Sequence, residues 1–208
     1  FSSVVWREAM KPILRAFVRH SEAQCGEQVL GYQVAAGAAA EWSYLWDPGQ
    51  SDYSPSHRKA YRLWLTQRYG GDLERLRQAW KDPTLTWDAV AVPLDRTRPR
   101  GAWSLLNPAK DQRLIDYQTY HNEAVADAII DFSRYTKEFL GEIGRDKIVG
   151  TFYGYYFWDA GWPCGYHNSG HHALAKVLAS PHVDMFCAPY SYQEKAPGGH
   201  THPQFPHG

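Results

Sequence analysis

The sequence has no excess of charge of either sign, because 22 lysine and arginine residues balance 22 aspartate and glutamate residues. Nucleic-acid-binding domains typically carry a basic patch, and membrane-surface proteins a polybasic segment, so we expect neither partner. The sequence also lacks an apolar run of the roughly 20 residues that a membrane-spanning helix needs, and its mean hydropathy is −0.54. These absences predict a soluble protein with no nucleic-acid and no membrane partner.

Cysteine is scarce and several cofactor motifs are missing. Cys25, Cys164 and Cys187 have no CxxC spacing, so neither a disulfide framework nor a cysteine-built zinc site is predicted. No GxGxxG or P-loop follows a predicted strand, and no HExxH occurs. We therefore expect no cofactor and no metal. The first residues, 1–3, show no charged-then-apolar leader, so the compartment stays open.

Aromatic residues, by contrast, are abundant. They make up 15% of the 208 residues and include nine Trp and fourteen Tyr. A sugar ring has an apolar face of axial hydrogens that stacks on an indole or phenol, so an aromatic cleft suits a carbohydrate. Most of these residues are expected in the core, and those that follow predicted strands are the candidates for ligand contact.

Helical and strand patterns alternate along the chain. Apolar residues recur every three or four positions in the predicted helices, and short apolar runs mark the predicted strands. The expected helices cover residues 4–23, 55–70, 72–80, 110–140 and 171–179, the last capped by Ser169, and the expected strands cover residues 31–42, 147–159 and 183–192. This rhythm is typical of a parallel sheet with helical crossovers, and of a (β/α) barrel more than an open sheet.

The first predicted helix is amphipathic. Pro12 falls inside its pattern, so we expect the helix to start late or to kink there. Its apolar positions at helical spacing are Val5, Ala9, Ile13, Ala16 and Phe17.

The stretch 31–42 is the most informative part of the chain. It is predicted to be a buried strand that ends on small residues, the carboxylate of Glu41 and the indole of Trp42. Small residues allow close approach to the backbone, and Trp42 supplies the apolar surface that suits a proton-donating carboxyl group. The local pattern is also compatible with Glu41 as a surface loop carboxylate and Trp42 as a core anchor.

Four groups of residues along the chain resemble the middle of a β-galactosidase-like glycoside hydrolase of clan A. Their order and spacing carry the resemblance, which extends over nearly all of the chain. The groups are Gly31-Tyr32-Gln33 with Gly37 and Glu41-Trp42; Tyr61-Arg62-Leu63-Trp64-Leu65 with Tyr69-Gly70, Leu76 and Ala79-Trp80; Gly150-Thr151-Phe152-Tyr153-Gly154-Tyr155; and Ser169-Gly170-His171 with Leu178, Ser180-Pro181, Val183-Asp184, Pro189-Tyr190-Ser191-Tyr192 and Pro197-Gly198-Gly199.

This resemblance implies a TIM-type (β/α)8 barrel, of which residues 1–208 would form part of the catalytic domain, about strands 4 to 6 with their helices. Residues 43–109 would be a helical insertion after the acid/base strand. The clan has a retaining mechanism with the acid/base on strand 4 and the nucleophile on strand 7, so Glu41 matches the acid/base. The nucleophile would then lie outside this chain, and the substrate would be a terminal β-linked sugar.

Other positions follow from the same comparison. Many enzymes of the clan have Asn before the acid/base, where this chain has Ala40. If residues 1–208 were the whole protein, Asp159 or Glu194 would have to serve as the second carboxylate. Tyr192 would orient the nucleophile. The expected substrate contacts are Trp42, Tyr155, Trp158, His171 and Tyr192.

Two other functions are compatible with the sequence. Metal-assisted hydrolysis could use imidazoles from the loops near the predicted site. A carbohydrate-binding or scaffold module would keep the aromatic cleft without a complete catalytic pair. The sequence leaves open which sugar is bound and whether the protein is a homo-oligomer. The histidines in question are His167, His171, His172, His200 and His202.

Overall fold

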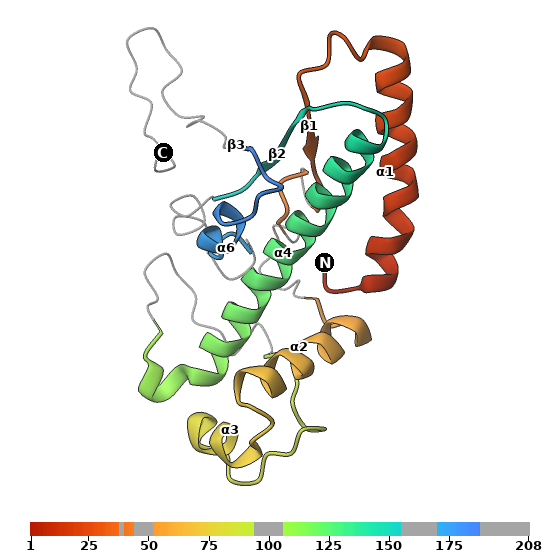
Figure 1. The fold of residues 1–208 in the computed structure, drawn as a ribbon. Coiled ribbons are helices and arrows are strands. Elements are labelled where there is room, and N and C mark those ends of the chain that lie inside the picture. The colour runs from red at the N-terminus through yellow and green to blue at the C-terminus, as the bar shows by residue number, and fades with distance from the viewer. Residues whose placement is uncertain (38–39, 44–51, 94–105, 155–169, 188–208) are drawn as a thin grey trace, which may run out of the picture.

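The computed structural model describes residues 1–37, 40–43, 52–93, 106–154 and 170–187. Its elements are α1 (Val4–Cys25), β1 (Gly31–Val34), α2 (Pro55–Arg68), α3 (Leu73–Trp80), α4 (Pro108–Glu142), β2 (Ile148–Phe152), α6 (Leu174–Leu178) and β3 (Met185–Cys187). The long helix α4 runs between the α2–α3 pair at one end and the strands at the other, with α1 beside its far end (Figure 1). The alternation confirms the predicted α/β class.

The three strands form one parallel sheet in the order β1-β2-β3. Gly31 of β1 pairs with Ile148 of β2, and Gly150 of β2 pairs with Met185 of β3. A Cβ atom on Gly31 would lie 2.3 Å from the carbonyl oxygen of Ile148, so this register needs glycine. Parallel neighbours require crossovers, which here pass through α2, α3 and α4 and then through α6.

Helix α1 begins at a serine cap. The Ser3 hydroxyl accepts a hydrogen bond from the Trp6 N–H at 3.2 Å. The helix continues through Pro12, so the late start expected from the sequence is wrong. Pro12 is exposed, and water can therefore bond the carbonyl that the missing N–H leaves unpaired.

The buried face of α1 also differs from the expected one. Val5, Ile13 and Phe17 are 80%, 60% and 62% exposed, and the two alanines of that face are exposed as well. Both sides of the helix carry apolar residues at helical spacing, and packing against α4 decides which side is buried. The side chains of α1 that reach the core are Trp6, Met10, Leu14 and Val18.

A first hydrophobic core joins α1, α4 and α6 to the sheet. Each large apolar side chain that is fully buried contributes roughly 1.5–3 kcal/mol. The members at 5% exposure or less are Val18, Val34, Trp42, Val125, Ala126, Ala128, Ile129, Phe132, Phe139, Leu140, Val149, Tyr153 and Val177.

Strands β1 and β2 and the last helix are shorter than expected. The expected end of the third strand, residue 192, lies outside the described residues. Strand β1 ends at Val34, so the prediction that it extends to Glu41 is wrong. The chain leaves the extended conformation soon afterwards, because Gly37 has φ of 78°. Helix α6 begins after Ala173, which makes no side-chain capping bond. The predicted cap, Ser169, lies outside the described residues.

The helices α2 and α3 are bounded as the sequence predicts. The Ser54 hydroxyl accepts from the His57 N–H, and the Asp72 carboxylate accepts from two N–H groups of the first turn of α3. Between the helices, Gly70 and Gly71 both have positive φ. Helices α2 and α3 pack on α4 around a second core. Its members are Tyr61, Leu65, Tyr69, Leu76, Leu85, Val90, Val92, Tyr117, Tyr120 and Ala124.

A buried carboxylate links the elements around the second core. The Asp116 side chain is fully buried and accepts hydrogen bonds from the Tyr69 hydroxyl at 2.6 Å, the Trp80 indole N–H at 2.8 Å and the Gln112 amide at 2.8 Å. The Arg68 Nε lies 3.1 Å from the same carboxylate. Donors from α2, α3, α4 and the turn after α2 therefore meet at one group, which satisfies its charge.

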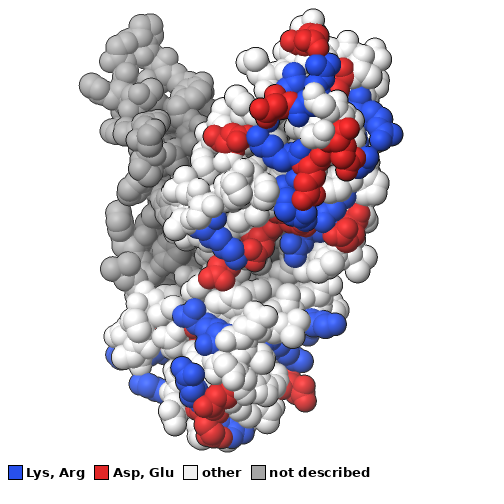
Figure 2. Space-filling model, viewed as in Figure 1, with Lys and Arg blue, Asp and Glu red and all other residues white. Residues whose placement is uncertain are grey.

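The outer surface near α1 is polar. Lysine, arginine and acidic side chains are interspersed there in Figure 2. Arg15 of α1 pairs with Glu142 of α4 at 2.5 Å, and Arg145 pairs with Glu22 and Glu27 at 3.1 and 2.7 Å. The Glu22 side chain is only 5% exposed, whereas the other two pairs lie at the surface and contribute about 0–1 kcal/mol each. Among the described residues, no helix has the length and apolar character to cross a membrane.

Candidate functional site

Glu41 lies in a tight turn after β1, beyond the carboxyl end of the strand. Its neighbours Ala40 and Trp42 both have left-handed backbone conformations, with φ of 64° and 58°. Such conformations cost about 1–3 kcal/mol each in residues other than glycine. The turn is closed by the Trp42 N–H, which donates to the Ala36 carbonyl at 2.8 Å. The structure thus holds the Glu41 residue, half-buried, between two strained neighbours.

Trp42 anchors this turn to the first core. Its side chain is 1% exposed, and its indole N–H donates to the Val34 carbonyl at 3.1 Å. The ring lies 6.0 Å from the ring of Phe132 and 5.5 Å from that of Phe1. The local interactions of Trp42 therefore lie in the protein interior, and its contact with a substrate stays a prediction.

His171 lies on the other side of the Glu41 backbone. It is fully buried, its Nδ1 accepts a hydrogen bond from the Gly154 N–H at 3.1 Å, and its Nε2 lies 2.7 Å from the Glu41 carbonyl oxygen. Because Nδ1 is an acceptor, the proton belongs on Nε2, which donates to Glu41. The structure places His171 against backbone, and its contact with a substrate also stays a prediction.

The imidazole of His171 is uncharged at neutral pH. Burial lowers the pKa of His171 to about 3, although its hydrogen bond to the Glu41 backbone acts in the opposite direction. A neutral ring is what the two backbone contacts require, since one ring nitrogen must accept and the other must donate.

The sequence-predicted site residues fall into two groups. Glu41, Trp42 and His171 are brought together at the carboxyl edge of the sheet. The predicted contacts Tyr155, Trp158 and Tyr192, and the alternative carboxylates Asp159 and Glu194, lie outside the described residues.

Two residues of this region were part of the family resemblance but had no predicted role in the site. Tyr153 stacks on the His171 ring at 4.7 Å between centroids with an interplanar angle of 19°, and Gly154 with φ of 97° supplies the N–H that fixes the imidazole. The signal was an aromatic residue followed by glycine directly after a strand, which is typical of a turn that approaches another segment closely.

The alternative function, metal-assisted hydrolysis, would depend on histidine side chains and not on Glu41. In the described ranges, no three His, Cys, Asp or Glu side chains come together as potential metal ligands. His167, His200 and His202 lie outside those ranges. His171 uses both ring nitrogens for backbone contacts.

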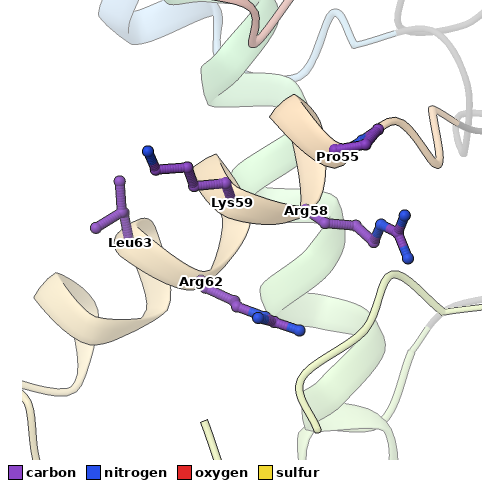
Figure 3. A pocket seen from close by; sticks show the side chains of 5 residues that line it. All are labelled: Pro55, Arg58, Lys59, Arg62 and Leu63. Carbon is purple, nitrogen blue, oxygen red and sulfur yellow. The ribbon is translucent and has the colours of Figure 1, made fainter. Parts of the chain in front are cut away.

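A shallow recess on α2 is separate from this region. Figure 3 shows its lining side chains, all projecting from the same helix. Arg62 donates from Nε to the Val90 carbonyl at 3.1 Å and from a terminal nitrogen to the Asp88 carbonyl at 2.6 Å, which ties it to the chain after α3. The recess has no carboxylate among its lining residues Pro55, Arg58, Lys59, Arg62 and Leu63, so it offers no acid/base pair.

The strain at Ala40 gives a first testable prediction. Replacing Ala40 with glycine should raise the free energy of unfolding by up to about 1 kcal/mol, because relief of the left-handed conformation exceeds the added entropy of the unfolded chain. Ala35 is exposed and has negative φ, so Ala35→Gly is the matched control and should lower stability by about 0.5–1 kcal/mol. Urea unfolding of both variants checks the prediction, and a loss at both positions would contradict it.

Solved structures of beta-galactosidases share this fold. The chain matches a beta-galactosidase from the psychrophilic Marinomonas ef1 with 18% identity and a TM-score of 0.50, over 77% of this chain and 22% of that one. It matches a beta-galactosidase from Bacillus circulans sp. alkalophilus with 18% identity and a TM-score of 0.51, over 78% and 23%. The chain therefore spans less than a quarter of these structures. No curated protein matches it.

A family comparison covers more than half of the sequence. Residues 1–173 match the model of glycoside hydrolase family 42, described as beta-galactosidase. The matched region contains the whole Glu41 turn, the strand β2 and His171. On this match, the chain belongs to glycoside hydrolase family 42, the beta-galactosidase family.

Proposed function

We propose that the protein is a retaining glycoside hydrolase that cleaves terminal β-linked sugars, with Glu41 as the general acid/base. The observation that carries the proposal is the position of Glu41 in a family 42 chain, in a constrained turn beyond the carboxyl end of a parallel strand. Carboxyl ends of parallel strands are where enzymes of α/β architecture place their reactive groups. The chain spans under a quarter of the matched structures, so the activity of the complete protein belongs to this proposal.

In this proposal the sheet is part of a (β/α)8 barrel. Strands β1, β2 and β3 would be barrel strands 4, 5 and 6, which fits their sequential order and parallel direction. Residues 43–109, with α2 and α3, would form the insertion after the acid/base strand. The predicted contacts beyond β2 and β3 would face the same edge as Glu41, since they also follow strand ends.

The proposed reaction has two steps. The Glu41 carboxyl group donates its proton to the glycosidic oxygen while a nucleophilic carboxylate, outside this chain, attacks the anomeric carbon and the aglycon leaves as an alcohol. The Glu41 carboxylate then accepts a proton from the water that displaces the nucleophile, which returns both carboxyl groups to their starting states.

Hydrolysis of aryl β-galactosides by the complete gene product tests this role. Glu41→Ala should lower kcat/KM on substrates with poor leaving groups by at least about 100-fold, because these need the proton. Activated aryl groups should be affected less. On the activated aryl groups azide should restore turnover and yield a β-galactosyl azide, since a small anion can replace the base-assisted water that breaks down the glycosyl-enzyme.

A surface glutamate provides the matched control. Glu27 is largely exposed and pairs with Arg145, so Glu27→Ala should keep wild-type kinetics on every substrate. Equal activity of Glu41→Ala and wild type would remove Glu41 from the mechanism. A wild-type protein that binds sugars but hydrolyses none would favour the carbohydrate-binding module instead.

A further inference from the structure

His171 connects the segments that follow two neighbouring strands. Its Nδ1 accepts from the Gly154 N–H at 3.1 Å, just after β2, and its Nε2 lies 2.7 Å from the Glu41 carbonyl, after β1. The ring is fully buried. Both of its polar atoms are therefore used to hold backbone, and one of the two backbones is that of the proposed acid/base.

The imidazole is itself held rigidly. The Tyr153 ring stacks on it, and the Tyr153 hydroxyl donates to the Gly170 carbonyl at 3.0 Å and accepts from the Ala173 N–H at 3.2 Å. Gly170 has φ of 73°, and a Cβ atom there would lie 2.4 Å from a methyl group of Val125. The segment on both sides of His171 is thus held against Tyr153, directly after β2, and against α4, which restricts the orientation of the ring.

The Glu41 turn needs such support. The residues on both sides of Glu41 have left-handed conformations, which persist only where the surroundings determine them. The Trp42 backbone and indole N–H groups bind the turn to the chain before it. The His171 contact binds it from the opposite segment and fixes the peptide plane that carries the Glu41 Cα.

We propose that His171 is a positioning residue for Glu41: it donates a hydrogen bond from Nε2 to the Glu41 carbonyl and so directs the carboxyl group toward the glycosidic oxygen. This inference rests on the proposed function of Glu41. It explains why a buried histidine, with no open surface of its own, lies beside the candidate site. Small displacements of a catalytic group lower the rate strongly, so loss of this bond should appear in kcat.

Three replacements of His171 separate the contacts. His171→Phe keeps a flat ring without either hydrogen bond, and His171→Gln places an amide N–H within reach of the Glu41 carbonyl. His171→Asn is shorter, so it can accept from Gly154 without reaching Glu41. On poor leaving groups we expect kcat to fall roughly 10- to 100-fold for Phe, with KM within about 2-fold. The Gln variant should recover most of the loss.

A double-mutant cycle with Glu41→Ala gives the decisive readout. If His171 acts through Glu41, adding His171→Phe to Glu41→Ala should change kcat by less than about 2-fold, because the positioned carboxyl group is already gone. An equal loss in both backgrounds would show a merely structural role and overturn the proposal. If circular dichroism shows that the Phe variant is unfolded, the Asn variant takes its place in the cycle.

The failure of this inference differs from the failure of the proposed function. If Glu41→Ala is as active as wild type, both the acid/base role of Glu41 and the positioning role of His171 are refuted. If Glu41→Ala is inactive on poor leaving groups and azide rescues its turnover of activated aryl substrates, while His171→Phe keeps the wild-type dependence on leaving group, only the positioning role is refuted.

Discussion

Replacing Asp116 with alanine should lower the free energy of unfolding by about 3–5 kcal/mol. The carboxylate is fully buried and receives hydrogen bonds from Tyr69, Trp80 and Gln112, with Arg68 in an ion pair. Removing it leaves the hydroxyl and indole donors inside the second core without their acceptor, and the arginine without its partner. Each buried donor that loses its partner costs about 1–3 kcal/mol.

Urea unfolding of the Asp116→Ala variant checks this value, with a second aspartate of α4 as control. Asp127 pairs with Lys176 at 2.6 Å, and both side chains are about half exposed. Asp127→Ala should therefore cost no more than about 1 kcal/mol. Equal effects at the two positions would mean that the Asp116 hydrogen bonds contribute no more than a surface pair.

The stability of the protein should fall on acidification because of His171. The pKa of its imidazole is lowered by burial from 6.5 to about 3 in the folded state. Between these two values the unfolded chain binds a proton that the folded chain does not, so the free energy of unfolding rises with pH in that window. The contribution is fully present above 6.5 and is lost as the pH falls toward 3.

Denaturation midpoints at two pH values measure this effect. From about pH 7 to about pH 5, His171 alone should remove about 2 kcal/mol of stability. The His171→Gln variant has no titrating group there, so its stability should fall by that much less over the same interval. Identical pH dependence in wild type and variant would show that burial does not lower the pKa of His171 in the folded protein.

Local signals in the sequence predicted the element order well. Ser54 and Asp72 cap their helices as expected, and Gly70 and Gly71 separate α2 from α3. These features depend on hydrogen bonds within a few residues, which a single sequence contains. The parallel sheet followed from the alternation of helices and strands.

Features that depend on distant neighbours were harder to predict. The face of α1 that is buried depends on α4, which begins at Pro108, far along the chain from the end of α1 at Cys25, and both faces of α1 are apolar enough to pack there. The strand before Glu41 ends at Val34, and the chain turns from Gly37 onward. The left-handed conformations of Ala40 and Trp42 beside Glu41 have no signal in the sequence.

In the candidate site, too, contacts between sequence neighbours could be predicted and contacts between distant residues could not. The sequence placed Glu41 and Trp42 together because they are adjacent, and it named His171 as a substrate contact from its place in the resemblance. The pairing of His171 with the Glu41 carbonyl joins residues on separate crossovers, and only the fold brings them together.

Helix α4 takes part in two separate cores, one against the sheet and one against α2 and α3. The second core has its own aromatic cluster and its own buried carboxylate, so mutations there can be accommodated without repacking the side chains that support the Glu41 turn. In evolutionary terms, this arrangement would allow the α2–α3 unit to change in sequence and length independently of β1 and the turn that follows it, because α4 separates the two cores.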